Sequence, residues 1–79
     1  MKLEIITPER EMFSGDVISV KLPGKDGGFE ILNNHASIVS TLTQGKITIT
    51  QENKERNDFD VKGGVIEMQG NKIVILANE

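Results

Sequence analysis

The stretch Val17–Gly24, which reads V-I-S-V-K-L-P-G, decides the fold class of this chain. Ile18, Val20 and Leu22 occupy every second position, and a Pro-Gly pair ends the run. A period of two is typical of a strand with one buried face, so these three residues are predicted to face the core. Ile47 and Ile49 repeat the pattern in the segment Lys46–Gln51.

Glycine and proline interrupt the rest of the chain too often for a long helix. The sequence therefore predicts an all-β protein, a two-sheet β-sandwich or flattened barrel of about nine or ten short strands with no substantial helix. The expected strands are Lys2–Thr7, Glu11–Phe13, Val17–Leu22, Phe29–Leu32, Ser37–Leu42, Lys46–Gln51, Arg56–Val61, Val65–Met68 and Lys72–Ala77.

Two segments need separate interpretation. The window Lys46–Lys62 contains no Gly or Pro, but Phe59 is the only apolar residue between Gln51 and Asp60, so a helix there would have no face to bury. A hairpin with a charged tip at Glu52–Lys54 is predicted instead. The run Ile73–Leu76 is apolar at every position, which predicts a central strand covered on both faces.

Composition limits the function classes. Seventy-nine residues are expected to form one domain, residues 1–79. The absence of cysteine indicates a reducing compartment such as the cytoplasm. The segment Met1–Ile6 has the pattern of neither a signal peptide nor a membrane span. A net charge of −3 and only three aromatic residues argue against nucleic-acid binding.

No motif predicts catalysis, a cofactor or a metal site. The single histidine, His35, lacks the glycine-framed elbow of serine hydrolases, although Ser37 and Ser40 follow it closely. The segment Gly24–Gly28 has neither the order nor the following helix of a phosphate-binding loop, so it is interpreted as a turn. One imidazole is too few ligands for a metal site.

Five short motifs together resemble the epsilon subunit of F-type ATP synthases. They are Glu11–Gly15, Gly27–Ala36, Leu42–Gly45, Gly63–Glu67 and Leu76–Asn78, and their order and spacing match the family over nearly the whole chain.

The resemblance implies a non-catalytic rotor subunit of the central stalk. Such a subunit couples the gamma subunit to the ring of c subunits during proton-driven ATP synthesis, and it lies at the cytoplasmic face of the bacterial cell membrane, which it meets only through the complex. Epsilon subunits typically continue into two helices that form an inhibitory arm, and this chain stops at Glu79 before them. The resemblance thus predicts coupling without the arm, whether Glu79 is a natural end or a boundary.

The resemblance also implies which residues contact gamma and the c ring. His35 is expected to act as a contact residue, and Thr7 and Ser40 are added as family positions near the same junction. The loop that faces the two partners corresponds to Gly27, Gly28, Phe29, Glu30, Ile31, Asn33, Asn34 and His35.

This loop departs from the family at three places. Asn33-Asn34 replaces the usual Pro-Gly, Ser37 replaces a proline, and Glu30 stands where the family often has glycine. Because asparagine tolerates left-handed backbone better than most residues, Asn34 is expected to replace the glycine.

Two other functions are compatible with the residues. One is a free-standing β-barrel module that binds a small molecule or a protein, which would contain an enclosed apolar pocket. The other is a small hydrolase that uses His35 with Ser37 or Ser40.

Overall fold

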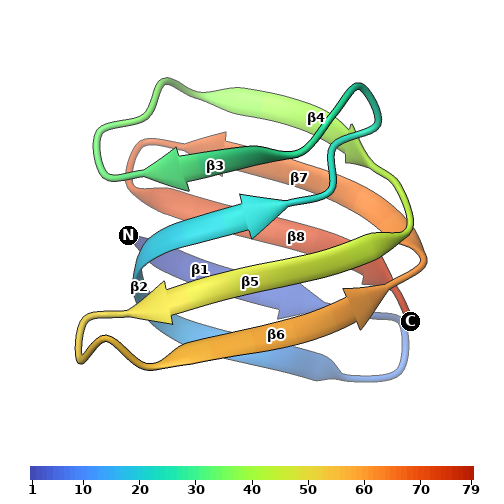
Figure 1. The fold of residues 1–79 in the computed structure, drawn as a ribbon, viewed down its shortest axis with the longest axis horizontal. Helices are drawn as coiled ribbons and strands as arrows, with labels where there is room; N and C mark the ends of the chain where they lie inside the picture. The colour runs from blue at the N-terminus through green and yellow to red at the C-terminus, as the bar shows by residue number, and fades with distance from the viewer.

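Eight strands and no helix make up the computed structural model, which describes all residues from Met1 to Glu79 (Figure 1). The all-β prediction is confirmed. The strands are β1 (Lys2–Ile6), β2 (Glu11–Leu22), β3 (Phe29–Leu32), β4 (Ile38–Leu42), β5 (Gly45–Gln51), β6 (Arg56–Val61), β7 (Gly63–Gln69) and β8 (Lys72–Asn78).

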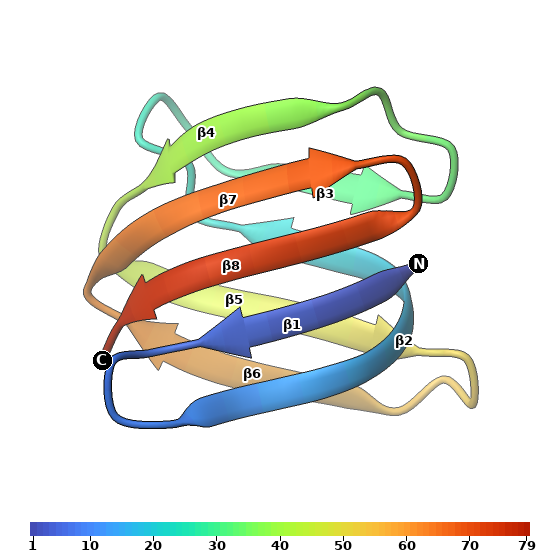
Figure 2. The same ribbon diagram turned by 180° about the vertical axis from the view of Figure 1, so that it is seen from behind.

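The strands form two layers that share β2. Sheet A has the order β4-β7-β8-β1-β2, and sheet B has the order β3-β2-β5-β6. All neighbours are antiparallel except β1 and β8, which are parallel. Figure 1 shows sheet B in front of sheet A, and Figure 2 shows sheet A from its outer side. The predicted two-sheet sandwich is thereby confirmed.

The long strand β2 explains why fewer strands form than the nine or ten expected. The segments Glu11–Phe13 and Val17–Leu22 join into one strand of 12 residues. Its first part pairs with β1 in sheet A and its later part pairs with β5 in sheet B, with a register shift between Val17 and Ser19. Gly15 therefore marks no break, because a strand that crosses from one sheet to the other continues through it.

Because of the same register shift, the predicted alternation of buried and exposed residues is wrong at the start of the segment Val17–Leu22. Val17 is fully buried, although the period of two placed it on the outer face, and Ile18 is only partly buried. A bulge inserts one extra residue and so reverses which side chains face inward. Val20 and Leu22, beyond the shift, are buried as predicted.

The core lies between the sheets and consists of apolar side chains from both. Sixteen buried apolar residues form one cluster, to which sheet A gives Leu3, Ile5, Ile66, Met68, Ile73 and Ile75 and sheet B gives Val20, Leu22, Ile31, Ile47, Ile49 and Val61, among others. Because these side chains fill the interior, the largest hollows of the molecule lie at its surface.

Two further predictions have opposite outcomes. The window Lys46–Lys62 forms the β5–β6 hairpin, so the rejection of a helix is confirmed. Strand β8 is central, between β1 and β7, but the prediction that both of its faces are covered is wrong. Ile73 and Ile75 are buried, whereas Leu76 is 57% exposed and Val74 is only partly buried.

Candidate interaction surfaces

The predicted contact segment Gly27–His35 is not one loop in the structure. Its middle forms β3, which separates Gly27 and Gly28 from Asn33, Asn34 and His35. Four residues of strand extend over about 13 Å. In Figure 1 the loop before β3 lies beside the tip of β4, and the loop after β3 lies at the opposite end of the molecule, near the N-terminus.

The loop after β3 is held by hydrogen bonds within a turn and by a hydrogen bond from the N-terminal amino group. The His35 N–H donates to the Leu32 carbonyl at 3.3 Å, and Asn34 has a φ of 68°. The expectation that Asn34 replaces a glycine is therefore confirmed. The Met1 amino group donates to Asn33 Oδ1 at 3.4 Å and to the Val17 carbonyl at 3.1 Å.

His35 is exposed and its ring is turned toward its own loop. Nδ1 lies 2.7 Å from the Ala36 carbonyl oxygen, to which it donates in the Nδ1–H tautomer. No hydrogen bond joins the ring to Ser37 or Ser40. No group of three His, Cys, Asp or Glu side chains is close enough to hold a metal ion.

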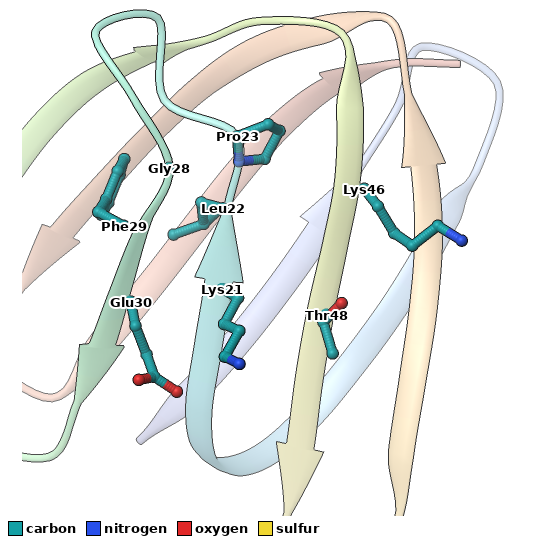
Figure 3. A pocket seen from close by; sticks show the side chains of 8 residues that line it. All are labelled: Lys21, Leu22, Pro23, Gly28, Phe29, Glu30, Lys46 and Thr48. Atoms are coloured by element: carbon teal, nitrogen blue, oxygen red, sulfur yellow. The ribbon is translucent and has the colours of Figure 1, made fainter.

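The loop before β3 borders the largest surface hollow, with a volume of about 470 Å³. Figure 3 shows its lining on the outer side of sheet B, where Lys21 and Lys46 come from neighbouring strands and Glu30 is the register partner of Lys21. The hollow is open to solvent and mixes charged with apolar side chains. The hollow is lined by Lys21, Leu22, Pro23, Gly28, Phe29, Glu30, Lys46 and Thr48.

Thr7 and Ser40 do not join either loop. Thr7 is 5% exposed, and its hydroxyl donates to the Arg10 carbonyl and accepts from the N–H groups of Glu9 and Arg10. It therefore stabilises the β1–β2 turn from within. Ser40 is partly buried on β4, where it pairs with Ile66 of β7.

An exposed apolar surface on sheet A was missed by the sequence analysis. It lies on the outer face of β4, β7, β8 and β1, the face shown in Figure 2, and we name it the outer apolar patch. Its members are Ile6, Val39 (71% exposed), Val65 (43%), Val74 and Leu76 (57%). The run Ile73–Leu76 could have indicated this surface, because it is apolar on both faces and no other segment of this chain packs on its outer face.

Three members of the patch are direct neighbours across the strands. Val65 pairs with Leu76, and Leu76 pairs with Ile6. A shallow hollow of about 200 Å³ is lined by Val39, Val65, Val74 and Leu76. Glu67 also lines it and is the register partner of both Val39 and Val74, so one carboxylate lies within the patch. Glu4 lies next to Val74 and is paired with Lys72 at 3.2 Å, so one border of the patch is charged.

The structure contains no helix, and hence none that is long and apolar enough to cross a membrane.

Solved structures share this fold at low sequence identity. The structure titled Euglena gracilis mitochondrial ATP synthase, OSCP/F1/c-ring in rotational state 1, contains a chain that matches with a TM-score of 0.91 and 16% identity, over 98% of this chain and 49% of that one. A chain of the Tetrahymena thermophila mitochondrial ATP synthase central stalk/c-ring matches with a TM-score of 0.84 and 18% identity, over 100% of this chain and 63% of that one.

Sequence relatives are considerably closer. The ATP synthase epsilon chain of Chlorobium limicola is 40% identical over 78 residues, which cover 99% of this chain and 89% of the relative. That of Campylobacter curvus is 44% identical over 78 residues, but they cover only 60% of the relative. The family model described as ATP synthase, delta/epsilon chain, beta-sandwich domain matches residues 1–79. The chain therefore belongs to the ATP synthase epsilon-chain family, and the matched part is its β-sandwich domain.

Proposed function

We propose that this chain is a non-catalytic rotor subunit of an F-type ATP synthase. It holds the gamma subunit to the c ring at the cytoplasmic face of the bacterial membrane during proton-driven ATP synthesis, and it meets the membrane only through the complex. Relatives of this chain are ATP synthase epsilon chains, and the chains that share its fold come from assemblies whose titles name the central stalk and the c ring.

The outer apolar patch is the observation that carries this proposal. Monomeric soluble proteins rarely leave neighbouring large apolar side chains exposed on one sheet face, and such patches are typical of protein interfaces. Val39, Val65 and Leu76 are all more than two fifths exposed. The second apolar face of β8 thus receives its cover from a partner, and we assign that cover to gamma.

The interior of the molecule suits a mechanical role. A close-packed interior deforms little and transmits strain. The sixteen-residue core joins both sheets, so a force applied at one surface is passed to the other. The 79 residues contain no helix, so an inhibitory helical arm is no part of them, and the role proposed for them is coupling.

The two loops at the ends of β3 provide further contacts. We assign Gly27, Gly28, Asn33, Asn34 and His35 to the junction with gamma and the c ring, together with Phe29 and Glu30 of β3. Ser40 lies on β4, apart from both loops, and is not assigned to this junction. Ile31 is fully buried and Thr7 nearly so, and their side chains support the neighbouring backbone from inside.

The alternative of a free-standing ligand-binding module is less well supported. A small-molecule site is normally concave and mostly apolar. The largest hollow here is open and lined partly by Lys21, Lys46 and Glu30, and the space between the sheets is occupied by the core.

Co-expression with gamma tests the proposal. The two proteins are expected to co-purify as a stable complex on size exclusion. Failure of folded gamma and the folded chain to associate would overturn the assignment. Binding of a small molecule within the hollow of Figure 3, without affinity for gamma, would support the alternative module.

A further inference from the structure

One side of β4 carries no neighbouring strand. β4 is one of the two outer strands of sheet A and pairs only with β7 (Figure 2). The loop that follows β2 covers just the last part of its free side. The Lys25 N–H donates to the Thr41 carbonyl at 3.0 Å, and the Thr43 N–H donates to the Pro23 carbonyl at 2.8 Å.

These two hydrogen bonds fix which backbone groups point away from β7. In an antiparallel pair, successive residues direct their N–H and C=O groups alternately toward the partner strand and away from it. The Thr41 carbonyl points away from β7, so both backbone groups of Val39 and the N–H of Thr41 do so as well. Val39 has no partner on that side, and it is 71% exposed.

The other free edges carry charges that discourage pairing. Arg56, Asp58 and Asp60 alternate along β6 and are exposed, and Glu30 is exposed on β3. Charged side chains on edge strands normally prevent the addition of another chain. β4 reads Ile-Val-Ser-Thr-Leu and has no charge, no proline and no glycine. The first part of β2, at the opposite edge of sheet A, carries Glu11 and Asp16, so β4 is the one outer strand without a charged residue.

We propose that an extended segment of the gamma subunit adds to sheet A as a further strand along the free edge of β4, centred on Val39. The inference rests on the proposed function. It is supported by continuity, because Val39 supplies both the free backbone groups of the edge and one side chain of the outer apolar patch. A strand satisfies those backbone groups, whereas a helix has none to offer in exchange.

The added strand has a predictable chemistry. Its backbone exchanges two hydrogen bonds with Val39 and accepts one from the Thr41 N–H. The side chains on the same face as Val39 extend the outer apolar patch, so every second residue of the gamma segment is expected to be apolar. The segment is short, because the Pro23–Lys25 loop covers the edge beyond Thr41.

Proline substitution separates the backbone contribution from that of the side chain. In Val39→Pro the lost N–H points away from β7, and proline is tolerated on such edge positions, so the variant is expected to fold. Its affinity for gamma should be at least about tenfold lower than that of Val39→Thr, which keeps the N–H and the branched shape. Ser40→Pro is the matched control, since its N–H faces β7 and its loss should destabilise the free subunit.

Amide hydrogen exchange gives a second, direct measurement. In the free subunit the amides of Val39 and Thr41 should exchange fast, while that of Ser40 is protected by β7. In the complex with gamma, Val39 and Thr41 should become protected.

The outcomes distinguish the inference from the proposed function. Strand addition is overturned, with the rotor role left intact, if gamma binds Val39→Pro as tightly as Val39→Thr or if the Val39 amide of the unsubstituted subunit stays unprotected in the complex. Concentration-dependent protection of Val39 in the subunit alone would assign the edge to a second copy and also overturn the inference. Absence of any complex with folded gamma removes the proposed function itself.

Discussion

Val65 and Leu76 are register partners on β7 and β8, and both side chains point out of sheet A into solvent, 43% and 57% exposed. Apolar pairs across neighbouring strands normally stabilise a sheet from its buried face. Here the pair is in the middle of an uncovered face, which makes it the natural centre of the proposed interface with gamma.

Leu76→Gln is therefore expected to weaken gamma binding by at least about tenfold while the fold is kept, because central apolar residues carry most of the energy of an interface. Isothermal titration with purified gamma measures the effect. Ile18→Gln is the matched control, since Ile18 is partly exposed on β2 and belongs to neither the core cluster nor the outer apolar patch. Equal losses in both variants would contradict the assignment of the patch.

Neighbouring residues of β8 are expected to differ sharply in their effect on stability. Ile75 is fully buried and Leu76 points outward. Ile75→Ala should lower the free energy of unfolding by about 2–5 kcal/mol through lost burial and a cavity. Leu76→Ala should change it by about 0.5 kcal/mol or less in the free subunit. Urea denaturation of both variants tests the register, and a large loss for Leu76→Ala would contradict it.

The sequence predicted the sheets well and the surfaces poorly, for physical reasons. Alternation reports which residues are buried, so Val20, Leu22, Ile47 and Ile49 were placed correctly. The alternation pattern gives the wrong face for Val17, because a bulge exchanges the inward and outward positions of the strand. Whether a bulge forms depends on pairing partners far away in the chain.

The candidate site was harder to predict because apolar residues are usually read as core. The run Ile73–Leu76 was assigned two buried faces, and only the structure shows that this chain covers one. The resemblance supplied a contact segment, but a short strand within it moves its two ends apart.

Gly64 is expected to be intolerant of any side chain. A Cβ at this position would clash with the Leu76 carbonyl oxygen of the adjacent strand, and the φ of Gly64 is +154°. Gly64→Ala should therefore destabilise the subunit by several kcal/mol, on the order of an overpacked core. At Gly70 a Cβ meets nothing within 4 Å, so Gly70→Ala should cost only about 1–2 kcal/mol for its φ of +61°. Thermal unfolding compares the two, and similar losses would contradict the steric explanation.

Lys54 is a site at which the subunit can be stabilised. It has a φ of 73° in the β5–β6 turn, where its N–H donates to the Gln51 carbonyl at 2.9 Å. Glycine adopts this conformation without steric cost, so Lys54→Gly should raise the free energy of unfolding by about 0.5–1 kcal/mol. Glu52→Gly in the same turn has no positive φ to relieve and should be neutral or destabilising. Denaturation midpoints in urea measure both, and equal shifts would rule out the backbone explanation.

The positions of Gly28 and His35 at opposite ends of β3 predict that they serve different partners. A Cβ on Gly28 would lie 3.5 Å from the nearest atom, the Leu22 carbonyl oxygen, and His35 is exposed, so both sites should accept substitution without unfolding.

Gly28→Trp places a bulky ring at one end, and His35→Ala removes the imidazole at the other. Since the ends are about 13 Å apart, each variant should weaken binding of one partner by at least about tenfold and leave the other within about threefold. Binding to purified gamma and to solubilised c ring, with Glu52→Trp as a control for bulk at a remote turn, measures the separation. Equal weakening of the same partner by both variants would mean that one continuous surface covers β3, and the two loops would then have to be treated as a single site.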